Sequence, residues 1–259
     1  MKFSKYWLLV ASLSINCLTA QIQNNTTVYI ADSGETYIES GNYSFGNSPA
    51  ATSTSRTPSN YGKLSFGLSA TWTGASDSHF IDGYARTYSN IPFVCPVGQS
   101  GVYAPTKVTP SATSGVDAAY YRSNPSTIGS ALAASVSAIS TIEYWDIKGS
   151  TSAIVAISWR SSSNISALTG GNINRLTVIG WNGSSWNEIP SAVDGTSFLG
   201  GNSTLASGSI TSVSAVDLTT YSYFSLGVKS VICQPLTASS EIVKTWNGQW
   251  TPSPPTLAD

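Results

Sequence analysis

Residues 78–105 of the chain read SHFIDGYARTYSNIPFVCPVGQSGVYAP, and their pattern decides the fold class. From His79 to Tyr88, aromatic and charged side chains fall on every second position, which predicts one long strand with an aromatic face. Asp82 and Arg86 share that face but lie about 13 Å apart along an extended strand. Each of them therefore needs a partner on a neighbouring strand.

The second half of this stretch predicts a break followed by a second strand end. Pro96 and Pro105 lack the N–H that a sheet ladder requires, while Gly98 and Gly101 suit turns with positive φ. We therefore interpret the whole stretch as a junction between two β segments.

The first twenty residues have the features of a secretory signal peptide. Lys2 and Lys5 precede an apolar core that is too short to span a bilayer, and a small-residue end predicts cleavage before Gln21. Cys17 would suit lipid attachment, but the residues before it lack the usual leucine and small-residue pattern. We expect the chain to be exported through the inner membrane.

Composition and charge narrow the classes of partner. Without Lys2 and Lys5, ten basic residues face 13 acidic ones, and a net charge of −3 argues against nucleic acid or an anionic membrane surface. Only 10% of the 259 residues are charged, and Ser, Thr, Asn and Gly fill the polar balance, as is typical of exported β proteins. No stretch after the signal peptide has the length of a transmembrane helix.

Short strand candidates recur between residues 26 and 66, at intervals of about seven or eight residues. Turn-forming runs such as Asp32-Ser33-Gly34 and Ser40-Gly41-Asn42 separate them. This spacing fits either hairpins or a few solenoid-like rungs, and periodicity does not choose between them. The candidates are residues 28–30, 36–38, 42–45 and 63–66.

After residue 93 the strand candidates lengthen and alternate with turn-rich segments, which is the signature of an antiparallel sandwich. Residues 126–139 carry apolar side chains at a spacing of four, but their serine and β-branched content favours an ordered loop over a helix. The candidates are residues 106–109, 118–122, 141–147, 153–159, 176–181, 186–189, 209–213 and 223–228.

The pattern predicts an all-β chain in four parts. Residues 1–20 form the signal peptide, and residues 21–90 form a short β-rich part built of hairpins or solenoid-like rungs. An antiparallel β-sandwich follows in residues 91–230. Residues 231–259 contain a linker and the start of a further module, because a hairpin unit opens there and then stops in a proline-rich run.

Two segments place tryptophans around an Asn-Gly pair, WNGSSW at residues 181–186 and WNGQW at residues 246–250. Asn-Gly favours a type I′ hairpin turn, in which both residues have positive φ. Either these tryptophans pack across paired strands, or they form an exposed aromatic platform for a sugar ring. The residues of such a platform would be Trp181, Trp186, Trp246 and Trp250.

Two cysteines follow the signal peptide, Cys95 in the junction and Cys233 near the C-terminal end. In an exported protein they predict a disulfide, which would contribute about 4–5 kcal/mol in the chain-entropy model. The alternative is two separately buried thiols.

Residue types that carry catalysis or bind metals are sparse. His79 is the only histidine, its neighbours Asp77 and Ser78 do not by adjacency make a catalytic triad, and no G-x-S-x-G elbow is present. One histidine and two distant cysteines serve zinc poorly. Asp77 and Asp82 are calcium candidates, although no D-x-D-x-D-G loop surrounds them. The alternative is a turn capped by Asp77 and an Asp82 that pairs across the sheet. No cofactor-binding motif is present.

Glu143 and Asp146 flank Tyr144-Trp145 and invite comparison with a glycosidase. Such an enzyme needs two carboxylates that face one sugar across about 5–10 Å. In a strand Glu143 and Asp146 point to opposite faces, so they do not form that pair. Other pairs among the 13 acidic residues stay open.

Five segments carry a family resemblance: HFIDGYARTY, PFVCPVGQSGVYAP, EYWDI (residues 143–147), GWNGSSWNEIPS (residues 180–191) and YSYFSLG (residues 221–227). They resemble the N-terminal region of large exported surface proteins of Bacteroidota, cargo of the type IX secretion system, many of which are adhesin-like or linked to gliding. The resemblance covers nearly the whole chain after residue 20. It implies framework positions and says little about a ligand.

Members of that family usually carry a C-terminal sorting domain that directs passage across the outer membrane. Nothing in residues 233–259 resembles such a domain. The resemblance therefore implies either a fragment of a longer product or a short relative that stays in the periplasm or depends on another chain. It supports export more firmly than a place on the cell surface.

Together these features favour a non-enzymatic structural or adhesive β module of a bacterial surface protein. Its partners would be a glycan or a surface protein, and the secretion machinery if a sorting domain follows. The alternative is a carbohydrate-binding module that uses Trp72 and the tryptophans of the two Asn-Gly segments. A glycan-directed hydrolase is the third hypothesis.

Overall fold

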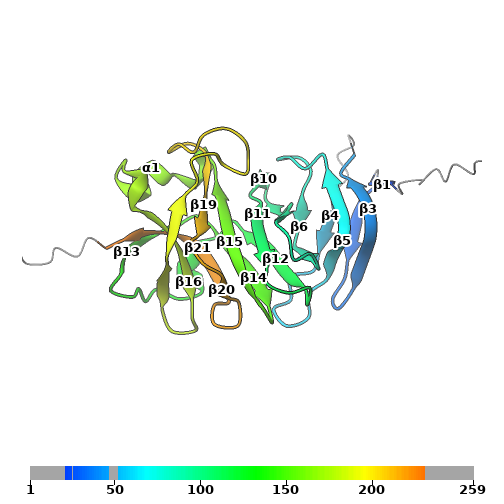
Figure 1. The fold of residues 1–259 in the computed structure, drawn as a ribbon, viewed down its shortest axis with the longest axis horizontal. Coiled ribbons are helices and arrows are strands. Elements are labelled where there is room, and N and C mark those ends of the chain that lie inside the picture. Colours follow the sequence, from blue (N-terminus) through cyan, green and yellow to red (C-terminus); the bar gives the residue numbers. More distant parts are fainter. Residues whose placement is uncertain (1–20, 25, 47–51, 231–259) are drawn as a thin grey trace, which may run out of the picture.

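The computed structural model describes residues 21–24, 26–46 and 52–230, and this part of the chain is all-β, as the sequence predicts. A parallel N-terminal region leads into an antiparallel sandwich, and one long sheet belongs to both (Figure 1). None of the helices in this part is long and apolar enough to cross a membrane. The predicted signal peptide and the segment 231–259 lie outside the described residues.

The N-terminal region is a short β-solenoid of parallel strands that alternate between two sheets. Parallel pairing excludes hairpins, so solenoid-like rungs are the correct alternative of the two that the spacing left open. The smaller sheet contains β2 (Val28–Ile30), β4 (Thr52–Thr54) and β6 (Ile81–Asp82). The long sheet begins with β1 (Gln21–Gln23), β3 (Glu35–Ser44), β5 (Lys63–Thr73) and β7 (Tyr84–Thr87).

Strand β3 contains two of the predicted strands and the turn predicted between them. The register of β3 against β5 shifts between Ile38 and Ser40, and Gly41 has a φ of 89°. The prediction of a turn here is wrong because Gly41, despite its positive φ, pairs with Ala70 of β5, and the register shift just before it does not end the strand.

The long strand predicted from His79 to Tyr88 is also wrong, because it is two strands in different sheets. Gly83, with a φ of 144°, turns the chain between β6 and β7. A side chain at Gly83 would collide with Thr54, so only glycine fits this corner. Within each half the predicted alternation is confirmed, since odd positions from 81 to 87 are buried and Asp82 is partly exposed.

The two glycines of the junction serve different purposes. Gly101, with a φ of 73°, and Ser100, with a φ of 53°, form the two-residue turn between β9 (Gly98–Gln99) and β10 (Val102–Tyr103). Gly98 does not have the predicted positive φ. It is needed because a side chain there would collide with the Val102 backbone and the Phe80 ring.

The sandwich consists of two sheets with antiparallel strands. The long sheet continues in the order β7-β12-β14-β21-β16-β17, and the second sheet has the order β18-β19-β15-β11-β8. The strands are β8 (Phe93–Cys95), β11 (Thr106–Pro110), β12 (Val116–Tyr121), β14 (Tyr144–Gly149), β15 (Ser152–Trp159), β16 (Leu176–Trp181), β17 (Trp186–Ile189), β18 (Ser191–Val193), β19 (Gly208–Ser212) and β21 (Tyr223–Lys229). Most of them match the predicted segments closely.

Residues 126–139 are not helical, as their composition predicts. A short 3-10 turn, η1 (Pro125–Thr127), is capped by Asn124, and β13 (Val136–Ile139) pairs with β21. Other short elements that were not predicted include α1 (Ile165–Thr169), η2 (Ser161–Ser163), η3 (Ile173–Arg175) and β20 (Val216–Asp217).

The long sheet crosses the boundary that was expected near residue 90. Strand β7 pairs antiparallel with β12, and Ala85 lies opposite Ala118. One hydrophobic core runs from Ile30 in the solenoid to Leu226 in the sandwich. Solenoid and sandwich thus share both a hydrogen-bonded sheet and buried apolar surface.

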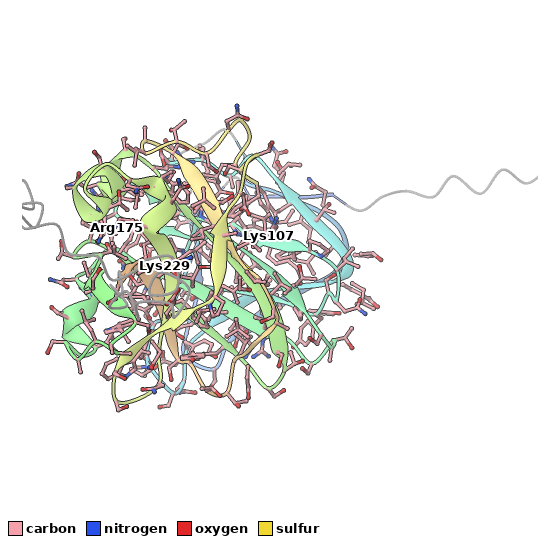
Figure 2. The ribbon with its side chains drawn as sticks, turned by 60° about the vertical axis from the view of Figure 1, so that its left-hand side comes forward. Lys107, Arg175 and Lys229 are labelled. Atoms are coloured by element: carbon pink, nitrogen blue, oxygen red, sulfur yellow. The ribbon has the colours of Figure 1, made fainter. Side chains whose placement is uncertain are left out.

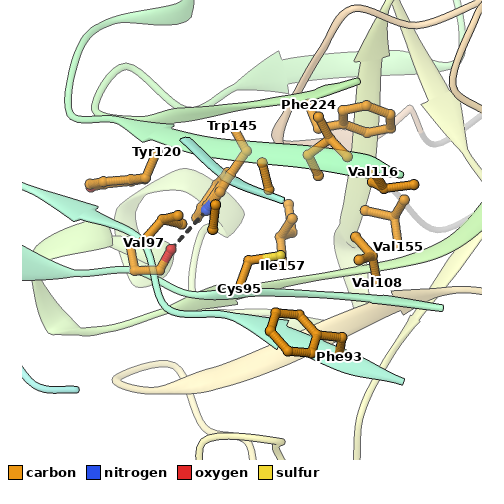
Figure 3. Close-up of a cluster of buried hydrophobic side chains, with 14 of the residues drawn as sticks. Phe93, Cys95, Val97, Val108, Val116, Tyr120, Trp145, Val155, Ile157 and Phe224 are labelled. Carbon is orange, nitrogen blue, oxygen red and sulfur yellow. Dashed lines mark hydrogen bonds between the residues drawn. The ribbon is translucent and has the colours of Figure 1, made fainter. Parts of the chain in front are cut away.

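Trp145 lies in the sandwich part of this core (Figure 3). It is completely buried, its indole N–H donates to the carbonyl of Ala104 at 2.9 Å, and its ring lies 5.3 Å from that of Tyr120. The N–H is the one polar group of the indole. Because it has a partner, burying Trp145 leaves no unsatisfied hydrogen-bond donor.

Limited proteolysis of the native chain should leave one resistant fragment of about 200 residues, because solenoid and sandwich can open only together. Mass spectrometry would identify its ends. Thermal unfolding followed by circular dichroism and by tryptophan fluorescence should give coincident transitions. Early release of a solenoid fragment that ends near residue 90 would contradict the shared core.

Candidate functional site

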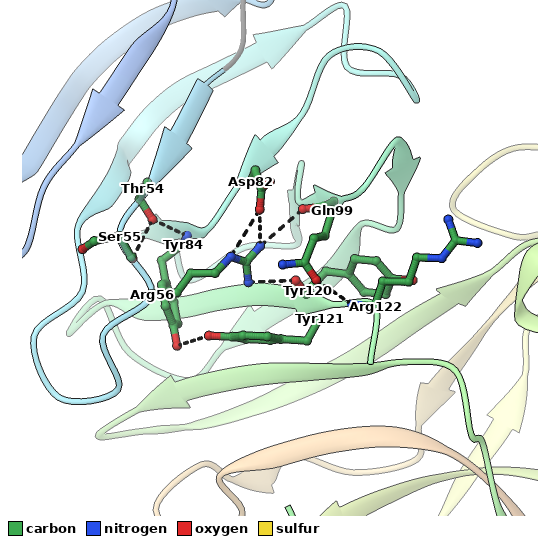
Figure 4. Close-up of polar contacts among 10 residues, drawn as sticks. Thr54, Ser55, Arg56, Asp82, Tyr84, Gln99, Tyr120, Tyr121 and Arg122 are labelled. Atoms are coloured by element: carbon green, nitrogen blue, oxygen red, sulfur yellow. Dashed lines mark hydrogen bonds and ion pairs between the residues drawn. The ribbon is translucent and has the colours of Figure 1, made fainter. Parts of the chain in front are cut away.

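Arg56, in the loop after β4, contacts both the solenoid and the sandwich (Figure 4). Its Nη2 donates to Asp82 Oδ1 at 2.6 Å, and its Nη1 donates to the carbonyl of Tyr120, in β12, at 2.9 Å. The guanidinium also lies 4.4 Å from the ring centroid of Tyr121. The Arg56 side chain is 18% exposed, whereas that of its partner Asp82 is 42% exposed, so only the arginine is largely shielded from water. The sequence predicts a partner for Asp82 on a neighbouring strand; its partner, Arg56, lies in the loop after β4 instead.

Arg86 has its partner on the adjacent strand, as predicted. Across the pairing of β7 with β12 it binds both carboxylate oxygens of Asp117, with Nη2 2.7 Å from Oδ2. The Tyr61 hydroxyl donates to the same carboxylate at 2.6 Å. Hydrogen bonding to Asp117 raises the pKa of Arg86 above its ordinary value, so the guanidinium stays charged.

Asp146 is a further anchored carboxylate on this face of the long sheet. It accepts from the Tyr84 hydroxyl at 2.6 Å and pairs with Lys148 at 2.8 Å. Tyr84 stacks on Tyr61 with 3.8 Å between ring centroids, and burial raises the pKa of Tyr84 well above its ordinary value. These carboxylates are held by fixed partners, and the arrangement serves to bind the strands together.

Glu143 lies on the other face of the sheet. Its Oε2 accepts from the hydroxyl of Tyr120, which packs in the core, whereas Asp146 contacts Tyr84 on the outer face. The two carboxyls therefore point to opposite sides, as the alternation predicts, and do not form a glycosidase pair. Glu143 is 1% exposed, and this burial raises its pKa above the ordinary carboxyl range.

His79 helps to close a turn at residues 76–79, and Asp77 in this turn binds Tyr103 and Arg160. The backbones of Ser76 and His79 exchange two hydrogen bonds, and His79 Nδ1 lies 3.3 Å from Ser76 Oγ. Asp77 accepts from the Tyr103 backbone N–H at 2.9 Å and pairs with Arg160 at 3.3 Å. Asp77 and Asp82, the calcium candidates, thus have separate partners. In the described ranges, no three His, Cys, Asp or Glu residues gather as a metal site would require.

The tryptophans of the first Asn-Gly segment pack across the strands β16 and β17. Trp186 is completely buried, its indole N–H donates to the carbonyl of Gly129 at 2.8 Å, and its ring lies 5.6 Å from that of Trp181. An exposed platform is therefore wrong for Trp186, because it has no face open to solvent. Trp246 and Trp250 lie outside the described residues.

The hairpin that joins β16 to β17 exists, but its turn is not of type I′. Four residues form the loop, and only Gly183, with a φ of 94°, has positive φ. The Asn182 side chain accepts from the backbone N–H groups of Ser184 and Ser185 at 3.0 and 2.9 Å. These side-chain hydrogen bonds hold the turn, and Asn182 does not adopt the positive φ that a type I′ turn requires.

Cys95 is completely buried in the sandwich core. Burial raises the pKa of its thiol, so the reactive thiolate is disfavoured. Its predicted partner Cys233 lies outside the described residues, and the disulfide stays a prediction.

Four basic side chains of the sandwich take part in no ion pair among the described residues: Lys107, Arg122, Arg175 and Lys229, of which Figure 2 labels all but Arg122. Lys229 Nζ donates to the carbonyl of Ser191 at 3.4 Å. Lys107 Nζ lies 5.2 Å from the ring centroid of Phe198. Lys107 thus contacts a ring that lines a groove in the surface.

This groove consists of two adjoining cavities of about 420 and 440 Å³, which share Trp72 and Val94. The Trp72 indole N–H donates to the Val94 carbonyl at 2.6 Å. One cavity has a polar and aromatic lining that includes Asp77, Tyr103, Arg160 and Phe198. The other is largely apolar and includes Leu68, Ile91 and Phe93. Sequence reasoning singled out Trp72 and Asp77 separately, but no local motif links them to residues 160 and 198.

Comparisons with protein-family models, with curated proteins and with solved structures found no match. The described residues therefore define the class by their own geometry: an all-β chain in which a parallel solenoid and an antiparallel sandwich share one sheet.

Replacing Arg56 should weaken the joint between solenoid and sandwich. Arg56→Ala should lower the free energy of unfolding by about 2 kcal/mol. The Tyr120 carbonyl loses its hydrogen-bond donor, and the Tyr121 ring loses the guanidinium that packs on it. Arg56→Lys should cost less, since it keeps the charge. Arg122→Ala removes an exposed arginine and is the control. Equal losses in Arg56→Ala and Arg122→Ala, in chemical denaturation, would contradict this role.

The buried Glu143 should make stability depend on pH. In the unfolded chain this carboxyl ionises in the ordinary range, whereas its raised pKa keeps it protonated to higher pH in the folded chain. Its contribution to stability is therefore complete at low pH and is lost as pH rises through the raised pKa.

The Glu143→Gln variant lacks this titration, so its stability relative to the native chain should increase between about pH 4 and pH 8. Thermal unfolding of both proteins across this range measures the difference. A difference that does not change with pH would show that Glu143 titrates alike in both states.

Proposed function

We propose that the chain is a structural or adhesive module of an exported bacterial surface protein. The observation that supports this best is the long sheet, which joins solenoid and sandwich into one body without a linker. In the view along the shortest axis, β1 and the end of β21 lie at opposite ends of the long axis (Figure 1). Such a body suits a rigid segment that holds neighbouring parts of a surface protein apart.

The chemistry of the buried polar groups supports a non-enzymatic role. Asp117 and Asp146 are each held by a basic side chain and a tyrosine hydroxyl, and Glu143 is isolated from them on the far side of the sheet. Carboxyls fixed in this way favour strand cohesion over acid–base chemistry. The predicted signal peptide and the resemblance to type IX secretion cargo supply the exported location in this proposal.

Surface labelling of intact cells tests the proposal. An epitope inserted between Gly200 and Gly201 would sit in an exposed turn, where a side chain added at either glycine would meet no other atom within 4 Å. The tagged protein, expressed from its complete reading frame in a bacterium of the Bacteroidota, should bind antibody on unbroken cells.

A matched variant that lacks residues 1–20 should label only after the cells are lysed. Labelling of the complete protein that also requires lysis would contradict a surface location. Equal export of both forms would contradict the signal peptide.

A further inference from the structure

We propose that the groove around Trp72 binds an uncharged oligosaccharide. The inference rests on the proposed adhesive role and gives it a ligand class. Trp72 and Val94 line both of the two cavities, of about 420 and 440 Å³, so the indole lies between two spaces that consecutive sugar units would occupy.

Trp72 is held in one orientation and lines both cavities. Its indole N–H is anchored on the Val94 carbonyl at 2.6 Å, and its ring meets Phe45 edge-on with 6.3 Å between centroids. The residue is only partly buried. A fixed aromatic ring provides a large contact area at little entropic cost, and the apolar C–H face of a pyranose can stack on it.

Beside the indole, Asp77 and Arg160 offer hydrogen bonds of both kinds. Their side chains are 57% and 35% exposed and lie 3.3 Å apart. A carboxylate accepts and a guanidinium donates, so together they match neighbouring sugar hydroxyls, each of which donates and accepts. The two charges balance each other, which favours an uncharged ligand over an acidic one.

The polar end of the groove is also preorganised. Asp77 accepts from the Tyr103 backbone, and the turn that carries Asp77 is closed by the paired backbones of Ser76 and His79. A ligand would therefore meet side chains that are already in place, which lowers the entropic cost of binding.

A peptide fits this groove less well. Strand β8 is the edge strand of its sheet, where a peptide could add as a further strand. However, the Val94 carbonyl in β8 is already occupied by the indole of Trp72. A new strand would lose a ladder hydrogen bond there, whereas a sugar needs only the ring and the side chains.

Calorimetric titration of the purified chain with cellohexaose, laminarihexaose, mannohexaose and chitohexaose tests the proposal. At least one of these uncharged probes should bind saturably. Trp72→Ala should weaken that binding by about tenfold or more, and Asp77→Asn by about threefold or more. Circular dichroism would verify that each variant is folded, and Asp77→Asn decides the matter if Trp72→Ala does not fold.

Asp217→Asn is the matched control, because Asp217 is likewise exposed and accepts from a backbone N–H, that of Thr219, at 2.9 Å. Binding should be unchanged in this variant. Hexagalacturonate is titrated in the same way as an acidic comparison. The proposal would be overturned if none of the four uncharged probes binds, if only hexagalacturonate binds, or if binding survives both groove substitutions. These outcomes leave the surface-labelling test of the structural role untouched.

Discussion

The pairing of β7 with β12 is the constraint on which the rest of the structure depends. On one side of this seam the strands are parallel, and on the other they are antiparallel. Its outer face carries Arg86 and Asp117 directly opposite each other, and Arg56 reaches across from the solenoid. Partly buried ions are tolerated when their hydrogen bonds are complete, and here tyrosine hydroxyls and backbone carbonyls supply the remaining partners.

Much of the fold class could be predicted because alternation is a local property. The sequence around residues 81–87 shows which side chains face the core, and the requirement for partners at Asp82 and Arg86 follows from strand geometry alone. Which strand pairs with which is not local. Parallel rungs and hairpins have the same alternation. Gly41 and Gly83 both have positive φ, yet the strand continues through Gly41 and the chain turns at Gly83, which depends on their neighbours in space.

The candidate site shows the same limit for side chains. Trp186 and Trp72 were both named as candidate sugar-binding residues, yet Trp186 is completely buried and bonded to Gly129, whereas Trp72 is only partly buried and lines two cavities. Asp77, Arg160 and Phe198 line one cavity although they come from distant parts of the chain. No motif could link them, because the sandwich brings them together by long-range pairing.

The solenoid also makes the length of the protein adjustable. Each rung pairs only with the rungs beside it, and neighbouring strands in a sheet lie about 4.8 Å apart. A duplicated or deleted rung would move the N-terminal end outward or inward by one such step. The pairing of β7 with β12 and the groove beside β8 would stay unchanged, so the number of rungs sets the reach of the molecule without altering the sandwich.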